Sequence, residues 1–272
     1  MPNTSTSEKV AISVYIIAKN EEDRIQRAIR SVIDWVDEVV VVDSGSEDDT
    51  VCVATKAGAH VLYYPWSGYG PQKRLAEDHC RNTWLFNLDA DEEVSPALAA
   101  EIQSQFRGSL PDCAAFEMRV TDMLPGETRP KWFAYSYRIM RLYDRRAGRC
   151  SPHPYKDRVE INSGKIAKLN GKIWHFSFRD WRSMIAKINF YTSQVAEDRA
   201  HRPSRWLRLR LFFEFPIKFV NCYLGRRFIF RGSMGLAWSI TVAYLNLLRL
   251  LKTAEAQQSL SSHPTIEANQ AA

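Results

Sequence analysis

The sequence has few of the features that build disulfide-rich or zinc-stabilised proteins. Its 272 residues contain five scattered cysteines, and no two of them are spaced as Cys-x-x-Cys. An odd, irregular set of thiols indicates neither a disulfide framework nor a zinc site. Residues 1–9 are polar and lack a basic segment followed by an apolar core, so no secretory signal is expected. The sequence therefore predicts a cytoplasmic protein with reduced cysteines.

Glycine-rich phosphate loops are also missing. Neither G-x-G-x-x-G nor G-x-x-x-x-G-K-[ST] follows the first apolar run, which argues against a Rossmann dinucleotide site and against a P-loop.

Acidic residues are fewer than basic ones, because the chain contains 37 Lys and Arg but 31 Asp and Glu, which gives a net charge of +6. This balance favours an anionic partner, which the charge alone leaves open as nucleic acid, nucleotide or lipid headgroup.

What is present is an alternation of buried strands and amphipathic helices. β-Branched apolar runs predict strands at residues 10–18, 38–42, 60–64 and 84–88. Apolar residues at helical spacing predict helices at 25–33, 51–57 and 71–80. Strand-helix alternation with short connections predicts an α/β fold, a doubly wound and mainly parallel Rossmann-like sheet with helices on both faces.

Polar clusters follow three of these strands, and the most acidic is Asp89-Ala-Asp-Glu-Glu93. Ligands bind beyond the carboxyl ends of strands in such sheets. The oxygens of Asp89 and Asp91 are placed to converge on Mg²⁺ or Mn²⁺ that also contacts a diphosphate. The alternative is a solvated acidic loop in front of the helix that Ser95-Pro96 would start.

Four motifs in order carry a family resemblance. They are Ile16-Ile-Ala-Lys-Asn-Glu-Glu22, Val40-Val-Val-Asp-Ser-Gly-Ser-Glu-Asp-Asp-Thr50, Gly68-Tyr-Gly-Pro-Gln-Lys73 and Asn87-Leu-Asp-Ala-Asp-Glu92. Together they resemble the inverting family 2 glycosyltransferases with the GT-A fold, and most of all the lipopolysaccharide core-biosynthesis glucosyltransferase group. The resemblance implies a catalytic domain over residues 10–200. It also implies metal-dependent transfer of a hexose, glucose from UDP-glucose, to a lipopolysaccharide-core or lipid-linked saccharide.

The resemblance also implies roles for single residues. Asp91 is expected to bind the metal directly, and Asp89 to contact the ribose or the metal. His175 is expected near the metal or diphosphate, the alternative being a histidine satisfied within the core. Arg179 would help to neutralise the diphosphate. The remaining residues expected to bind the nucleotide-sugar are Ala18, Glu22, Asp43 and Lys73, with Gln72 beside Lys73. Each of three has an alternative interpretation: Asp43 as a residue that closes a turn, Glu22 as part of the first turn of a helix, and Lys73 as a solvated surface lysine.

The general base is expected in the stretch Pro152-His-Pro-Tyr-Lys-Asp-Arg-Val159. Lys156-Asp157 stands where the resembling group commonly has His-Glu, and Asp157 is the candidate base. His153 and Glu160 are the alternatives, and an ion pair between Asp157 and Arg158 is the structural interpretation.

The C-terminal part differs in composition from the rest. Arg202 to Arg231 contains eight Lys or Arg, one acid and many aromatic residues, which is typical of a surface lying on an anionic membrane. No nucleic-acid motif accompanies it. Residues 232–248 are uncharged, and a packed or interfacial helix is favoured there over a spanning one. The sequence thus predicts a peripheral membrane region at 201–253 on the inner face of the cytoplasmic membrane, followed by a disordered tail at 254–272.

Aromatic residues in the segment 124–137 have two interpretations. Trp132, Phe133, Tyr135 and Tyr137 either line an acceptor site by stacking on sugar rings or serve in packing.

Two rival functions remain at this level. A sugar nucleotidyltransferase would begin with a Gly-rich, Arg-containing loop, and Ala18-Lys-Asn-Glu21 is not one. The second rival is a catalytically inactive membrane- or saccharide-binding module that keeps the fold. Intact Asp43, Asp89 and Asp91 argue against it, whereas the unusual Lys156-Asp157 leaves it open.

Overall fold

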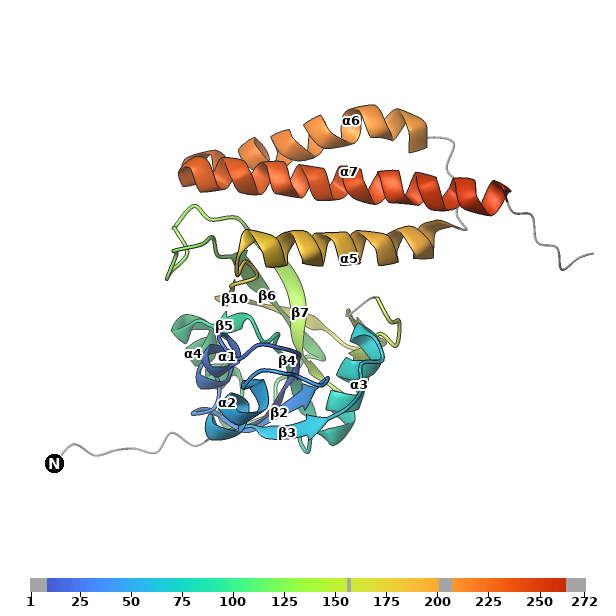
Figure 1. The fold of residues 1–272 in the computed structure, drawn as a ribbon. Coiled ribbons are helices and arrows are strands. Elements are labelled where there is room, and N and C mark those ends of the chain that lie inside the picture. Colours follow the sequence, from blue (N-terminus) through green and yellow to red (C-terminus); the bar gives the residue numbers. More distant parts are fainter. Residues whose placement is uncertain (1–8, 156–157, 201–206, 263–272) are drawn as a thin grey trace, which may run out of the picture. The chain divides into compact units, whose positions relative to one another are not determined.

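The computed structural model describes residues 9–155, 158–200 and 207–262. The chain divides into two compact units (Figure 1). The first contains the described residues up to Met123, together with Thr128–Pro130 and Ser136–Ser177. The second contains Leu124–Glu127, Lys131–Tyr135 and the described residues from Phe178 onward.

The first unit is the predicted α/β domain. Its strands are β1 (Val10–Ala18), β2 (Val36–Asp43), β3 (His60–Tyr63), β4 (Trp84–Asn87), β5 (Glu92–Val94), β6 (Ala115–Asp122), β7 (Ser136–Asp144), β8 (Gly148–Cys150), β9 (Val159–Ile161) and β10 (Ile166–His175). Its helices are α1 (Ile25–Arg30), α2 (Thr50–Lys56), α3 (Tyr69–His79) and α4 (Pro96–Gln105). The predicted start of α4 is confirmed, because Ser95 Oγ accepts from Leu98 N at 3.3 Å and Pro96 occupies the first turn.

Eight strands form one sheet in the order β3-β2-β1-β4-β7-β6-β10-β5. The first four are parallel to one another, and β6 is parallel to β10. Strand β7 runs antiparallel between β4 and β6, and β5 runs antiparallel at the edge beside β10. The mainly parallel α/β sheet predicted from the sequence is confirmed, and it also contains two antiparallel strands, β5 and β7, that were not predicted.

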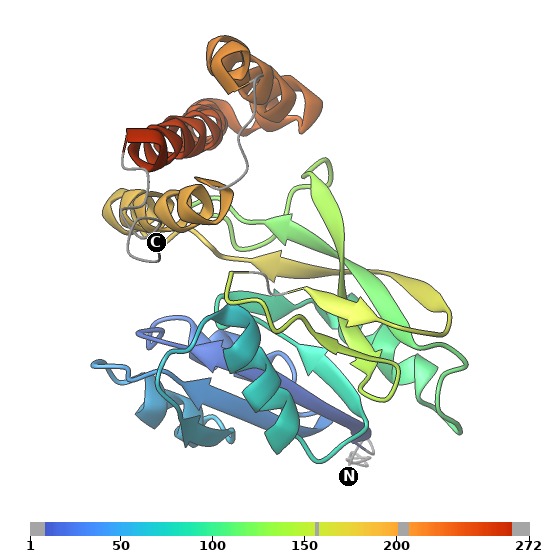
Figure 2. The same cartoon turned by 90° about the vertical axis from the view of Figure 1, so that its right-hand side faces the viewer.

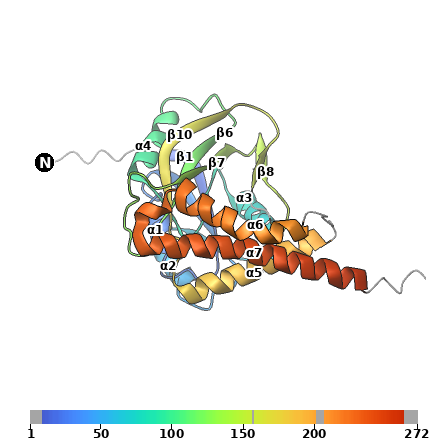
Figure 3. The same cartoon turned by 90° about the horizontal axis from the view of Figure 1, so that it is seen from above.

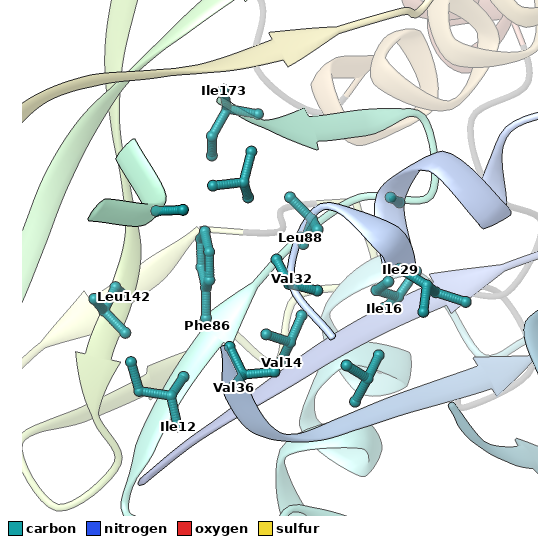
Figure 4. Close-up of a cluster of buried hydrophobic side chains, with 14 of the residues drawn as sticks. Ile12, Val14, Ile16, Ile29, Val32, Val36, Phe86, Leu88, Leu142 and Ile173 are labelled. Atoms are coloured by element: carbon teal, nitrogen blue, oxygen red, sulfur yellow. The ribbon is translucent and has the colours of Figure 1, made fainter. Parts of the chain in front are cut away.

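Apolar side chains cover both faces of this sheet. The larger cluster packs the strands against α1, α2 and α4, and its centre includes Val14, Phe86 and Ile173 (Figure 4). The smaller cluster joins the opposite face to α3 through Ala76 and Cys80. Burial on both faces explains why β1 and β2 read as continuous β-branched runs. The helices thus fix the sheet from both sides and leave its carboxyl edge to carry polar residues.

The second unit is helical. It contains α5 (Trp181–Ala200), α6 (Leu207–Val220), the π-helical turn η1 (Asn221–Gly225), the 3₁₀ turn η2 (Phe228–Arg231) and α7 (Gly232–Ser262). Helix α7 lies between α5 and α6, and Figures 2 and 3 show α6 extending along it.

Two boundaries differ from the sequence prediction. The structure groups α5 with α6 and α7, so the division falls after Ser177 instead of at residue 200. Helix α7 continues to Ser262, beyond the start predicted for the tail at 254. Gln257 Nε2 donates to Arg199 O of α5 at 3.4 Å, so contacts with a neighbouring helix extend α7 through a polar sequence.

Candidate active site

Five strand ends meet at one edge of the sheet. Strands β1, β2, β4, β6 and β10 share one direction, because β7 is antiparallel to both β4 and β6. Their ends bring together Ala18, Asp43, Asp89 just after β4, Asp122 and His175. In sheets of this kind ligands bind beyond the carboxyl ends of the strands, so this edge is the candidate site.

The loops after β1 and β2 brace each other. Asn20 N donates to Ser46 Oγ, and Glu47 N donates to Asn20 Oδ1, each at 2.9 Å. Asp49 N donates to Glu22 Oε2 at 3.0 Å. The carboxylate of Glu22, predicted to border the nucleoside, therefore also ties the two loops together.

Asp43 closes the turn that follows it. Its Oδ2 accepts from the backbone nitrogens of Gly45 and Ser46 at 2.9 Å, and Gly45 adopts a left-handed conformation with φ of 88°. Ser44 N donates to Ala18 O at 2.9 Å, which joins the ends of β1 and β2. Asp43 is buried, and this geometry matches its turn-closing interpretation; the nucleotide contacts of Ala18 and Asp43 stay predictions.

Asp89 is neutralised by two buried cations. Lys73 Nζ donates to its Oδ1 at 2.9 Å, and Arg141 Nη2 donates to its Oδ2 at 2.7 Å. Burial opposes ionisation of Asp89, but the charges of Arg141 and Lys73 outweigh burial and hold the pKa of this carboxyl well below its usual range. Lys73 is only 1% exposed, so it is an internal partner of the Asp-x-Asp turn and not a solvated surface lysine.

Glu92 fastens the same turn from its other end. Glu92 Oε2 accepts from Asp89 N at 2.9 Å, and Glu92 N donates to Asp89 O at 3.0 Å. Arg141 Nη2 also donates to Glu92 Oε1 at 2.7 Å. Burial raises the pKa of Glu92, and the charge of Arg141 opposes that rise. Arg141 and Glu92 thus hold the turn whose third residue is Asp91.

Asp91 faces a histidine that a second aspartate orients. His175 Nε2 lies 3.4 Å from Asp91 Oδ1, and His175 Nδ1 lies 3.0 Å from Asp122 Oδ1. Burial lowers the pKa of His175, but the charges of Asp91 and Asp122 outweigh burial and raise it well above its ordinary value. Arg24 Nη1 lies 3.6 Å from Asp91 Oδ2 and donates to the carbonyl oxygen of Phe176 at 3.2 Å.

The chemistry of these donors fits a divalent ion shared with a phosphate ligand. Over the described residues, no three His, Cys, Asp or Glu side chains are grouped to hold a metal. Asp91 and His175 offer two facing donor atoms, and Mg²⁺ commonly takes one or two protein ligands and completes its shell with water and substrate phosphates. The raised pKa of His175 favours a proton on both ring nitrogens, so a metal would have to displace the proton of Nε2. Asp122 at Nδ1 would then keep that nitrogen as the N–H and leave Nε2 as the ligand. The roles of Asp91 and His175 stay predictions that this geometry supports.

The segment predicted to carry the general base contacts α3 at its start. Asp157 lies outside the described residues. Of the two alternatives, Glu160 is exposed on β9, and His153 Nδ1 accepts from Tyr155 N at 3.2 Å. Tyr69 N, at the start of α3, donates to Pro154 O at 2.8 Å. The helix that carries Lys73 thus anchors the chain just before residue 157.

Gly70→Ala is expected to disturb this anchor. A Cβ at residue 70 would lie 2.1 Å from Ser151 O and 2.6 Å from His153 O, so the backbone of 151–153 must move. We expect the free energy of unfolding to fall by about 1–3 kcal/mol, the usual cost of overpacking, as measured by urea denaturation. Gly225→Ala is the control, because its added Cβ would approach nothing closer than 3.9 Å. Equal effects of the two substitutions would contradict the close packing.

The aromatic residues proposed for the acceptor divide between the units. Tyr137 belongs to β7 in the first unit, whereas Trp132, Phe133 and Tyr135 belong to the second. Phe133 packs on Phe230 with ring centroids 5.7 Å apart, and Arg226 stacks over Tyr135 at 4.8 Å. For Phe133 and Tyr135 the structure therefore favours the packing interpretation. Arg179, also in the second unit, is exposed.

A mainly parallel sheet with an Asp-x-Asp turn at its carboxyl edge is the arrangement of GT-A-type glycosyltransferases. The chain belongs to glycosyl transferase family 2, whose sequence profile matches residues 13–171. An uncharacterized glycosyltransferase of Rickettsia typhi is 38% identical over 253 residues, which cover 90% of this chain and 87% of the relative. The lipopolysaccharide core biosynthesis glycosyltransferase LpsC of Rhizobium meliloti is 28% identical over 95% of this chain and 97% of its own.

Among solved structures, glucosyl-3-phosphoglycerate synthase from Mycobacterium tuberculosis is similar at a TM-score of 0.47 and 18% identity. The alignment covers 72% of this chain and 82% of that one.

Proposed function

We propose that this family 2 glycosyltransferase is a metal-dependent, inverting hexosyltransferase that uses a UDP-sugar, with UDP-glucose as the first candidate. Its acceptor would be a lipopolysaccharide-core or lipid-linked saccharide. The facing pair of Asp91 and His175, 3.4 Å apart at the carboxyl edge of the sheet, carries the proposal. The relative named as a lipopolysaccharide core biosynthesis enzyme supports the acceptor class.

The residues at the edge suggest a division of labour. Asp91 and His175 would hold Mg²⁺ or Mn²⁺, which when bound would act as a Lewis acid on the departing diphosphate. Asp122 would keep the His175 ring in one orientation. Lys73, Arg141 and Glu92 would hold the Asp89 turn, so that Asp91 is positioned before the donor arrives.

The acceptor would be activated from the opposite side. An inverting transfer needs a base that takes the proton of the attacking hydroxyl while the diphosphate leaves from the other face. Asp157 is the proposed base, with His153 and Glu160 as alternatives. Asp43, Glu22 and the backbone at Ala18 would border the nucleoside, because they line the loops after β1 and β2.

The acceptor class also gives the proposed location. Lipid-linked saccharides and lipopolysaccharide-core precursors are presented at a membrane, and UDP-sugars would be supplied from the cytoplasm. We therefore place the enzyme as a peripheral protein on the inner face of the cytoplasmic membrane.

UDP release from a panel of UDP-sugars tests the function directly. We expect release with one hexose donor in the presence of Mn²⁺ or Mg²⁺ and a core-saccharide acceptor, and loss of release when EDTA removes the metal. The sugar that gives the highest rate identifies the donor. UDP binding without release from any donor, with an acceptor present, would instead indicate an inactive binding module.

A further inference from the structure

The exposed face of α6 is apolar. Phe212 is 78% exposed and Ile217 is 60% exposed. Exposed apolar residues recur along α6 every three or four positions, so they lie on one face of the helix. This set, here called the α6 strip, is Leu209, Phe212, Phe213, Ile217 and Val220. Soluble monomers rarely expose a contiguous apolar surface without a partner for it.

A second exposed aromatic group lies in the same unit. Trp132 is 89% exposed and its ring lies 5.5 Å from that of Phe133, which packs on the 64% exposed Phe230 of η2. Lys131 Nζ lies 5.9 Å from the Phe133 ring. Trp132, Phe133 and Phe230 are here called the aromatic tip. Trp is enriched at the membrane interface because its ring is apolar and its N–H is solvated, and Phe supplies apolar area to the buried face of interfacial helices.

The charge around these surfaces is positive. Residues 207–231 contain six Lys or Arg and one acid, Glu214. Glu214 is buried, and its carboxylate lies 3.1 Å from Arg210 Nη2 and 3.7 Å from Arg249 Nη2. The single negative charge is therefore neutralised inside the unit. Arg231 is also buried, paired with Glu127. Among the side chains that the structure describes in this segment, Arg210 and Arg227 are exposed and Lys218 and Arg226 are partly exposed.

The neighbouring helix α7 has a different character. Within the described residues, the stretch Phe228–Ser259 is long and apolar enough to cross a membrane. Arg249 of this helix, however, pairs with Glu214 of α6, and Lys252 Nζ donates to Asn189 O and Ser193 Oγ of α5 at 2.8 and 2.7 Å. A spanning α7 would break these contacts. The polar contacts therefore favour α7 as a helix packed between α5 and α6, although Ile240 and Tyr244 of α7 are also partly exposed.

We propose that the α6 strip and the aromatic tip form a surface that inserts into the headgroup region of an anionic bilayer, with α6 lying in the membrane plane. Apolar side chains supply burial and the surrounding Lys and Arg supply attraction to anionic lipid, which is the combination that holds interfacial helices. This inference deepens the proposed function, because a lipid-linked acceptor is presented at such a surface. Membrane binding through this surface does not require that the enzyme release UDP.

Vesicle co-sedimentation of the full chain tests the surface. We expect binding to phosphatidylcholine vesicles that contain about one quarter phosphatidylglycerol, and weak binding to pure phosphatidylcholine. Phe212→Glu combined with Ile217→Glu should lower the partition coefficient about 10-fold or more, because both apolar burial and charge attraction are lost. Trp132→Ser combined with Phe230→Ser should weaken binding through the second group independently.

Leu110→Ser is the matched control. Leu110 is 57% exposed, comparable to Ile217, but it belongs to the first unit. This substitution should leave the partition coefficient unchanged, and circular dichroism melting should show that all variants remain folded. Unchanged binding of both double variants would overturn the proposal. So would a wild-type dimer that the Phe212→Glu, Ile217→Glu variant converts to monomer, since a second copy would then cover the strip.

UDP release with a soluble saccharide acceptor separates this inference from the proposed function. If the double variants lose vesicle binding but keep soluble turnover, the membrane surface stands apart from the catalytic site. If wild type binds anionic vesicles but releases no UDP from any donor, the proposed function fails and the membrane surface still stands.

Discussion

Asp91→Asn is expected to lower UDP release about 10²–10³-fold, the usual cost of losing one group that stabilises charge in a transition state. Asp91 Oδ1 lies 3.4 Å from His175 Nε2, so the substitution removes the only anionic member of this donor pair. The amide keeps the shape of the side chain, and the fold should be preserved. Mn²⁺ affinity in the presence of UDP, measured by electron paramagnetic resonance, should fall in parallel with turnover.

Glu93→Gln provides the matched comparison for Asp91→Asn. Glu93 lies two residues further along, and its carboxylate lies 4.0 Å from Arg27 Nε rather than facing His175. We expect this variant to stay within about threefold of wild type, because surface ion pairs contribute little. If Asp91→Asn kept its Mn²⁺ affinity and lost turnover no more than Glu93→Gln, Asp91 would not be a metal ligand.

The part of the fold visible in the sequence is the part encoded locally. The continuous β-branched runs that became β1 and β2 predicted buried parallel strands, and Ser95-Pro96 predicted the start of α4. The antiparallel insertion of β7 between β4 and β6 was not predicted, because strand order is set by pairing between distant segments and leaves no periodic signal. The extension of α7 to Ser262 likewise depends on contacts with α5.

The residues of the candidate site were also predicted only in part. The Asp-x-Asp turn and His175 were identified from motifs, but Asp122 and Arg141 were not. Asp122 ends a strand, as Asp43 does, but β6 also contains Glu117 and Arg119, so its terminal carboxylate is less distinctive in the sequence. Arg141 showed only as a charged residue within the apolar stretch of β7, and its partners Asp89 and Glu92 lie about fifty residues away in sequence. A buried arginine requires an anionic partner, but the sequence does not indicate which residue supplies it.

Lys73 shows most clearly which contacts of the site could not be predicted from the sequence. The sequence is compatible with either a nucleotide contact or a solvated lysine at residue 73, and the structure shows an internal pair of Lys73 with Asp89. This pairing also explains why Asp89 and Asp91 are not equivalent. Both oxygens of Asp89 accept bonds from cations of the protein, so a ligand that used Asp89 would compete with Lys73 and Arg141. The contacts of Asp91 with His175 Nε2 and Arg24 Nη1 are longer, at 3.4 and 3.6 Å, and Asp91 stays the predicted metal ligand of the turn.

Arg141→Met is expected to be the most destabilising single substitution in this site. The side chain is 5% exposed and joins Asp89 to Glu92, whose own side chain is 1% exposed. Methionine fills similar apolar space but leaves the Glu92 carboxylate buried without this cation. Breaking a buried ion pair by removing one partner typically costs about 3–5 kcal/mol. Urea denaturation should therefore show a fall of that size in the free energy of unfolding.

A double substitution separates the lost charge pairing from lost packing. Adding Glu92→Gln to Arg141→Met removes the uncompensated charge, so the double variant should regain a substantial part of the stability that the single variant loses. Arg146→Met is the control, because Arg146 is 70% exposed and its pair with Asp144 should contribute less than about 1 kcal/mol. If Arg141→Met behaved like Arg146→Met, the Arg141 bridge would not hold the Asp-x-Asp turn. If Glu92→Gln gave no recovery, the cost of losing Arg141 would come from packing and not from the buried carboxylate.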